Sequence, residues 1–319
     1  MFEKTWDNLA SPIAPSLYRT IRFDKDSQWA LLLGKNHRGN RCVVFNISKD
    51  FYIDFTSIEK AHISLTYEKE LSCLALSLEN PDFNDLFNDL AFSFNNALKR
   101  ESSLDKATKL FIKTFLKWSV FFELPVERTL SKSCIVGLFG ELFKLKTLLT
   151  SKVHSSSIND TLLSWKGPYD EVHDFDFENS SLEVKTKLIS SGDIQISSEY
   201  QLERKDNKKL SLVVFNVQEN IISGEPISSL FLDIKSCILS NNGNIELFIS
   251  ALYQLGLNQK SILQYDNWRF IVIDSCEYDC EHIEFPRLVS SSLPTSIRNV
   301  KYSIYLNELE IFLIDKVVF

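Results

Sequence analysis

Acidic side chains that could bind a metal ion lie between residues 172 and 189, together with lysines. The alternation of polar and apolar residues there predicts two strands, joined by a turn at residues 178–179. With that turn, Asp174 lies directly across from Glu183. Paired residues point to the same side of a sheet, so Asp174, Glu183 and Lys185 would converge on one face.

Two facing carboxylates repel each other unless a cation lies between them. Mg²⁺ and Mn²⁺ accept carboxylate oxygens together with water and phosphate oxygens. Such an ion polarises a phosphodiester and helps to generate hydroxide, while a neighbouring lysine stabilises the charge that develops. Metal-dependent phosphodiester hydrolysis is therefore chemistry that an Asp…Glu-x-Lys arrangement can perform.

An acid followed two residues later by lysine is not specific by itself. The pattern occurs four times, and a solvated strand or helix face explains most such cases. The context of Glu183 favours a site, because an acid faces it at hairpin register and a helix with an intrusive glutamate precedes it. The four acids are Glu183, Glu203, Asp206 and Asp233.

That glutamate is Glu141, which interrupts the apolar stripe of a helix expected over residues 131–150. An ionised carboxylate on such a face is unfavourable unless it meets a cation or a strong hydrogen bond. Gly137 and Gly140 each weaken the helix by up to about 1 kcal/mol relative to alanine, which suggests that something approaches closely. Alternatively, Glu141 lies at the edge of the stripe and extends to water.

The rest of the chain changes pattern at Asn80-Pro81, where alternation gives way to helical spacing. A Ser-rich loop is expected after residue 150. Strands are expected at 28–34, 41–47, 61–67, 71–78, 171–189 (as a hairpin), 210–217, 268–274, 300–306 and 310–314, and helices at 82–99, 103–122, 131–150, 226–240 and 244–255.

Composition is that of an ordinary globular protein, with 319 residues, 44% hydrophobic and 24% charged. No apolar stretch of about eighteen residues and no secretory signal are found, so no membrane association is expected. Six scattered cysteines fit a reducing cytoplasm. The net charge of −7 argues against a protein that coats nucleic acid, yet a nuclease needs basic groups in one groove only.

Several motifs together resemble the PD-(D/E)XK motif proteins of bacterial defence and restriction gene clusters. Five occur in the same order and the tail adds three more. They are Gly137-Leu-Phe-Gly-Glu-Leu142, Trp165-Lys-Gly-Pro168, His173-Asp-Phe175, Glu183-Val-Lys185 and Ile196-Ser-Ser-Glu-Tyr-Gln-Leu202, followed by Phe285-Pro-Arg287, Leu293-Pro294 and Val300-Lys-Tyr302.

The resemblance implies an α/β (α+β) restriction-endonuclease-like core, with a central mixed sheet flanked by helices. The expected organisation has four parts: a β-rich region at 1–80, a helical connector at 81–130, the nuclease core at 131–235, and C-terminal α/β elements at 236–319 packed on that core.

By the same resemblance, Glu141, Asp174 and Glu183 are the metal ligands and Lys185 is the catalytic lysine. Gln201 matches a glutamine that can touch metal or nucleic acid in related nucleases. His173 stands where the family usually has proline, which leaves Asp176 as a substitute ligand.

The implied function is a Mg²⁺- or Mn²⁺-dependent endonuclease acting on DNA, as the cutting subunit of a restriction or anti-phage system. An ATPase or recognition subunit from the same gene cluster is the expected protein partner, and the sequence leaves a homodimer open. Two rivals remain: a degenerate nuclease fold that only binds nucleic acid or a partner, and a structural subunit whose charged residues form a surface ion network.

Three weaker signals are set aside. Cys276, Cys280 and His282 lack a fourth ligand and a standard zinc spacing. No Gly-x4-Gly-Lys-Ser/Thr loop for ATP is present. Basic clusters around Lys144–Lys152 and Arg204–Lys209 could follow a phosphate backbone, but solvated surface explains them equally well.

Overall fold

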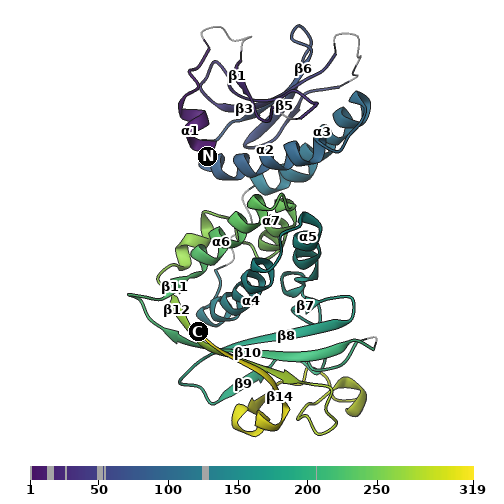
Figure 1. Ribbon diagram of the computed structural model, residues 1–319, viewed down its shortest axis with the longest axis vertical. Coiled ribbons are helices and arrows are strands. Elements are labelled where there is room, and N and C mark those ends of the chain that lie inside the picture. The colour runs from purple at the N-terminus through teal and green to yellow at the C-terminus, as the bar shows by residue number, and fades with distance from the viewer. Residues whose placement is uncertain are drawn as a thin grey trace. The chain divides into compact units, whose positions relative to one another are not determined.

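A computed structural model describes residues 2–12, 18–25, 27–48, 53, 55–123, 129–205 and 207–319. The chain forms two compact units, Met1–Val126 and Glu127–Phe319, each described by itself (Figure 1). The first unit contains both the β-rich region and the described part of the helical segment that follows it. In the described part of the chain, no helix has the length and apolarity needed to cross a membrane.

The first unit is built on a six-stranded antiparallel sheet. Central strands carry apolar side chains on both faces, and Val43, Phe45 and Leu74 are fully buried. The four strands expected from the sequence are confirmed, and the two edge strands were not predicted. In spatial order the strands are β1 (Arg19–Arg22), β2 (Leu31–Lys35), β3 (Arg41–Asn46), β6 (Cys73–Leu78), β5 (Ile63–Glu68) and β4 (Ile58–Glu59).

Two helices cover one face of this sheet, α2 (Asn84–Leu98) and α3 (Leu104–Ser119) (Figure 1). Ser103 begins α3 by accepting a hydrogen bond from the Lys106 amide, a common N-cap arrangement. Phe111 of α3 stacks on Phe45 of β3, with ring centroids 5.3 Å apart. The helical spacing in the sequence therefore corresponds to a face buried against the sheet.

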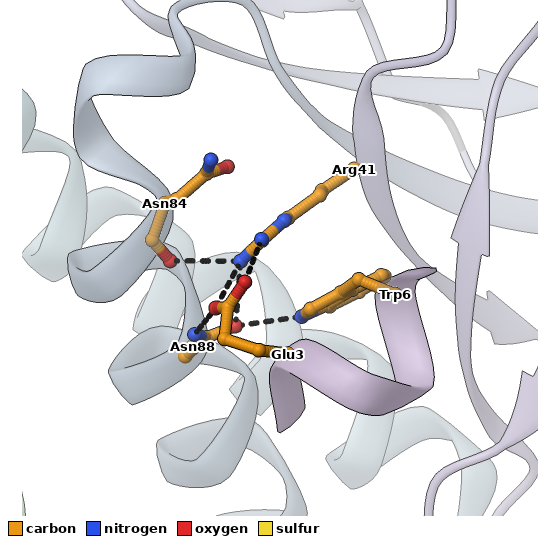
Figure 2. A network of polar contacts seen from close by, with 5 residues as sticks. All are labelled: Glu3, Trp6, Arg41, Asn84 and Asn88. Atoms are coloured by element: carbon orange, nitrogen blue, oxygen red, sulfur yellow. Dashed lines mark hydrogen bonds and ion pairs between the residues drawn. The ribbon is translucent and has the colours of Figure 1, made fainter. Parts of the chain in front are cut away.

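A buried arginine ties the N-terminal helix α1 (Phe2–Asp7) to this unit (Figure 2). Arg41 donates to both carboxylate oxygens of Glu3, at 2.9 and 2.5 Å. It also donates to the Asn84 carbonyl and to Asn88 Oδ1, which accepts from the Trp6 indole as well. This two-pronged pairing satisfies a guanidinium whose side chain is only 10% exposed.

The second unit is built on a mixed sheet. Strands β8 and β10 run parallel, whereas the other neighbours are antiparallel. The strands in order are β11 (Glu225–Pro226), β12 (Arg269–Asp279), β10 (Lys209–Glu219), β8 (Ser180–Leu188) and β7 (Phe175–Asp176), and β14 (Leu313–Val318) pairs with β12.

Helices lie over one face of the mixed sheet (Figure 1). They are α4 (Lys132–Thr150), α5 (Ser155–Ser164), α6 (Ile227–Ser240) and α7 (Ile245–Gln254). The opposite face carries an apolar cluster that includes Leu212, Val214, Tyr278 and Phe312. The small pair β9 (Asp193–Ile196) and β13 (Tyr302–Tyr305) contributes to that cluster. A mixed sheet flanked by helices confirms the expected fold class.

One expected loop is a helix instead. Residues 155–164, expected to belong to a Ser-rich loop, form α5. Ile158 and Leu162 lie one turn apart on it and both are buried, so tertiary packing outweighs the weak helix propensity of three consecutive serines. At the tail, residues 306–312 are 3₁₀-helical, and the last strand begins at Leu313.

Candidate active site

The hairpin that carries the candidate acids pairs as its turn predicts. Phe175 faces Leu182 and Asp176 faces Ser181. Strand β7 contains only these two residues, so it offers no backbone acceptor to the Val184 amide of β8. The Asp174 carboxylate serves as that acceptor: its Oδ2 accepts a hydrogen bond from the Val184 amide at 2.7 Å. Asp174 is thereby held at the open edge of the sheet.

Glu183 and Lys185 project from the same face of β8, opposite to Val184 and Thr186. Glu183 is 1% exposed, and its Oε1 lies 2.8 Å from Lys185 Nζ as an ion pair. Within the described residues, neither oxygen of Glu183 accepts a hydrogen bond of good geometry. A buried carboxylate with one cationic neighbour and no hydrogen bond is poorly satisfied, and a second cation would relieve it.

Glu141 approaches the same sheet edge from α4. Its Oε2 accepts a hydrogen bond from the Trp165 indole Nε1 at 2.8 Å, so the side chain turns inward rather than away to water. The close approach expected at this helix is confirmed at Gly140, where an added Cβ would overlap Thr186 Oγ1. It is wrong for Gly137, because nothing among the described residues lies within 4 Å of a Cβ there.

Gly167 brings Glu141 and Asp174 together. An added Cβ at this glycine would overlap Glu141 Oε2, and it would lie 3.1 Å from both Glu141 Cδ and Asp174 Oδ1. The two carboxyl groups thus flank one point. Each has one oxygen held by a neutral N–H donor, and within the described residues no hydrogen bond reaches the other oxygen, Oε1 of Glu141 or Oδ1 of Asp174.

The acids destabilise one another's charged forms. Burial, followed by the charge of Asp174, raises the pKa of Glu141 to about 8. Burial also raises the pKa of Asp174, which the Val184 amide and Lys185 partly oppose. The pKa of Glu183 is raised well above its usual value by burial and by Asp174. Acids whose pKa values are raised by burial and by one another gather more often at functional sites than elsewhere on a protein.

Gln201 contacts the lysine of the site. Its Oε1 accepts from Lys185 Nζ at 3.1 Å and from the Ser197 amide at 2.7 Å. Both interactions use the same oxygen, so Gln201 fixes Lys185 to the loop that begins at Ser197. The side chain of Gln201 thus serves the lysine and this loop rather than the carboxylates.

Asp176 lies apart from this group. Its Oδ1 lies 2.6 Å from Lys208 Nζ and accepts from Ser181, and its Oδ2 lies 3.9 Å from Lys205 Nζ. Burial alone would raise the pKa of Asp176, but these partners lower it overall. A carboxylate already paired with lysines has less to offer as a substitute ligand than Asp174.

The basic clusters noted in the sequence are largely paired with acids. Lys146 lies 2.6 Å from Asp233 and 3.2 Å from Glu225. Arg204 lies 3.1 Å from Glu281. Of the acid-x-Lys patterns, Asp233 thus belongs to a helix-surface ion pair, and Asp206 lies outside the described residues.

The fit of the acids to a metal ion depends on their free oxygens. Among the described residues, no three His, Cys, Asp or Glu side chains are arranged to hold an ion as they stand. Mg²⁺ is nonetheless bound in many proteins by one or two carboxylates plus water. The carboxyl groups of Glu141 and Asp174 meet beside Gly167, and among the described residues each keeps one oxygen without a hydrogen bond, so they fit that requirement. Glu183 lies close enough for the charges of both to raise its pKa.

The zinc candidate does not assemble. Cys276 and Cys280 are buried free thiols in the apolar cluster on the face of the sheet opposite the helices. The His282 ring packs on Phe312, with centroids 5.1 Å apart.

Two residues of the site were not assigned a role from the sequence, Trp165 and Gly167. Both lie in the Trp-Lys-Gly-Pro motif. A buried tryptophan usually finds an acceptor for its single polar atom, and a glycine two residues later allows a close approach. These properties signal a structured contact but do not identify Glu141 and Asp174 as its partners.

Comparison with known proteins agrees with this geometry. A family model described as "Putative PD-(D/E)XK family member, (DUF4420)" matches residues 2–307. No curated protein and no solved structure matches the chain. The match spans both units and includes every acid and the lysine at the sheet edge. The chain therefore belongs to this PD-(D/E)XK family.

Proposed function

We propose that the protein is a Mg²⁺- or Mn²⁺-dependent endonuclease that hydrolyses phosphodiester bonds in DNA. One observation carries the proposal: the carboxyl groups of Glu141 and Asp174 meet beside Gly167, within reach of the charge of Glu183, which is paired with Lys185. Membership of the PD-(D/E)XK family supports it.

In this proposal Glu141, Asp174 and Glu183 hold the ion. When bound, the ion would polarise the phosphodiester and lower the pKa of a coordinated water. Lys185 stabilises negative charge on the phosphoryl oxygens as a point charge beside the acids. Gln201 keeps the ammonium group of Lys185 in place through its hydrogen bond to Nζ.

A partner is part of the proposal. The chain carries a net charge of −7, and Lys146, Arg204 and Lys208 of its basic clusters are paired with acids. Phosphate contacts position a protein on DNA without specifying sequence. We therefore assign recognition to an ATPase or recognition subunit of a bacterial restriction or anti-phage system in the cytoplasm, where the six free thiols would stay reduced. A homodimer is compatible with this role.

The second candidate function is a degenerate nuclease fold that binds nucleic acid or a partner protein without cutting. The specific observation in its favour is that Lys185 already neutralises Glu183. A purely structural surface ion network is disfavoured, because Glu183 is only 1% exposed.

Two substitutions test the mechanism. Asp174→Ala removes a ligand, so both Mn²⁺ binding and cleavage should be lost. Lys185→Ala removes a cation, so Mn²⁺ should still bind, while cleavage falls by at least about a hundredfold. Lys187→Ala is the matched control, since Lys187 projects from the same face of β8 but donates to the Ser191 carbonyl.

The measurements are calorimetric Mn²⁺ titration and cleavage of DNA with the partner proteins present. Full activity of Lys185→Ala would sink the proposed mechanism. Mn²⁺ binding without cleavage by the wild-type protein would favour the degenerate fold, and absence of Mn²⁺ binding would overturn the metal-dependent function. Fast sequence-specific cutting by the isolated chain would contradict the need for a partner.

A further inference from the structure

The segment Trp165–Gly167 touches both acids that flank the candidate metal position. The indole Nε1 of Trp165 donates to Glu141 Oε2 at 2.8 Å. The amides of Lys166 and Gly167 donate to the main-chain carbonyl of Asp174, at 2.7 and 3.2 Å. Trp165 also forms an isolated β-bridge with Phe175. One three-residue segment is therefore bonded to α4 through a side chain and to the hairpin through its backbone.

The indole has little freedom to move. Trp165 is 1% exposed, and its ring centroid lies 6.1 Å from that of Phe248 on α7. Its backbone is fixed by the bridge to Phe175. A buried rigid ring directs its only N–H along one line, so the acceptor on Glu141 is fixed in position as well.

The bond leaves half of the carboxylate for another partner. Indole donates a single hydrogen, and only Oε2 of Glu141 receives it. The Val184 amide acts in the same way on Asp174, where it uses only Oδ2. Both donors are neutral, so they orient the acids without cancelling the negative charge that would attract a cation.

We propose that Trp165 is a positioning residue, which holds the Glu141 carboxyl group beside that of Asp174 so that both bind one divalent cation. This inference rests on the proposed metal-dependent function and adds a residue to it. It gives the Trp-Lys-Gly-Pro motif a physical role, in which the indole aligns one acid and the backbone aligns the other. Gly167 leaves the space in which the two acids meet.

A second buried tryptophan in the same chain provides a comparison. Trp118 of α3 is fully buried, and within the described residues its Nε1 has no hydrogen-bond partner. Burial of an indole in this protein therefore does not by itself require an acceptor. The choice of a carboxylate as acceptor for Trp165 points to a function beyond filling the core.

The test compares Trp165→Phe with Trp118→Phe in the full-length protein. Both remove an indole N–H and keep an aromatic ring, but only the first removes a bond to an acid. Mn²⁺ affinity, measured by calorimetry and by the electron paramagnetic resonance signal of free Mn²⁺, should fall by about ten- to hundredfold for Trp165→Phe. Trp118→Phe should bind Mn²⁺ as the wild type does.

A second measurement does not depend on the folding of Trp165→Phe. In the metal-free protein, the ¹⁵N-indole resonance of Trp165 should show strong protection from hydrogen exchange. Glu141→Ala should shift it and increase its exchange, whereas Glu178→Ala at the exposed turn should not.

The outcomes separate the two hypotheses. If the wild type binds Mn²⁺ and Trp165→Phe binds it equally well, the positioning role is overturned and the metal site stands. An indole resonance whose chemical shift and exchange rate do not change in Glu141→Ala also overturns the positioning role. If the wild type binds no Mn²⁺, the proposed function fails, and the positioning role fails with it.

Discussion

The hydroxyl of Thr186 on β8 fills the space that a side chain at Gly140 on α4 would need. Gly140 is one residue before Glu141, and Thr186 is one residue after Lys185. The contact therefore sets how closely α4, which carries Glu141, approaches β8, which carries Glu183 and Lys185. A glycine in the middle of a helix is explained here by packing and not by backbone conformation.

Alanine at the two glycines of α4 should have opposite effects. Gly140→Ala should lower the free energy of unfolding of the second unit by about 1–3 kcal/mol, because the methyl group overlaps Thr186 Oγ1. Gly137→Ala meets no described atom within 4 Å and should raise it by about 0.5–1 kcal/mol through helix propensity. Urea unfolding, with hydrogen exchange of the β8 and β10 amides as the probe, measures the free energy of unfolding of both variants.

A double substitution checks the cause. Thr186→Ala removes the hydroxyl, which has no hydrogen-bond partner among the described residues, and should restore most of the stability lost in Gly140→Ala. If Gly140→Ala is as stable as Gly137→Ala, α4 does not pack on β8 as described.

Gly167→Ala should weaken metal binding without unfolding the protein. Its Cβ would overlap the end of the flexible Glu141 side chain, which can move aside at little cost in stability. The moved carboxylate would leave its bond with Trp165 and its place beside Asp174. We expect a loss of about ten- to hundredfold in Mn²⁺ affinity, the range for groups that orient metal ligands.

The matched control is Gly192→Ala, at a glycine whose added Cβ would meet no described atom within 4 Å. Calorimetric titration with Mn²⁺ should give wild-type affinity for it. Equal affinities of Gly167→Ala and Gly192→Ala would show that the two acids do not share an ion beside Gly167.

Local pattern was enough to predict the hairpin register. The turn at residues 178–179 and the period of two determine that Asp176 faces Ser181, and this pairing is observed. The pattern did not show that β7 stops after two residues, which frees the Val184 amide for the Asp174 carboxylate. Phe175 also forms a bridge with Trp165, a tertiary contact that no local rule contains.

The positions of Glu141 and Gly140 illustrate the same limit. Helical periodicity placed Glu141 on an apolar stripe, but both a buried site and an exposed edge remained open. The choice is made by Trp165, which lies 24 residues later and supplies the hydrogen bond. Likewise, sequence treats Gly137 and Gly140 alike, and only the strand packed on α4 distinguishes them.

In the first unit, Arg41→Lys should be far more damaging than Arg38→Lys on the same hairpin. Lysine cannot make two parallel bonds to Glu3 and also reach the Asn84 carbonyl and Asn88, so most of these hydrogen bonds are lost (Figure 2). We expect a loss of about 1–3 kcal/mol. Arg38 is 68% exposed and 4.0 Å from Glu79, so its exchange should change stability by less than about 0.5 kcal/mol.

Hydrogen exchange of the β3 and β6 amides reports the stability of this unit separately from the second one. Similar exchange rates in Arg41→Lys and Arg38→Lys would mean that the network of Figure 2 does not hold α1 to the sheet.

The stability of the metal-free second unit should fall as pH rises from about 4.5 to about 8. The pKa of Glu141 is raised from 4.5 to about 8 in the folded protein, by burial and by Asp174. Between these values the folded state binds more protons than the unfolded state, so raising the pH favours unfolding. Asp174 and Glu183, whose pKa values are also raised, act in the same direction.

Glu141→Gln should flatten this dependence and make the metal-free protein more stable than wild type at pH 8. The amide cannot ionise, and its oxygen can still accept from Trp165. One group contributes at most ~1.4 kcal/mol per pH unit within the window.

Urea unfolding in EDTA between pH 5 and pH 8 measures the difference between the pH profiles of wild type and Glu141→Gln, with Glu178→Gln at the exposed turn as the control. Mn²⁺ should stabilise the wild type at pH 8 more than it stabilises Glu141→Gln, because only the wild type presents all three carboxylates. Parallel pH profiles for wild type and Glu141→Gln would contradict a raised pKa of Glu141 in the folded protein.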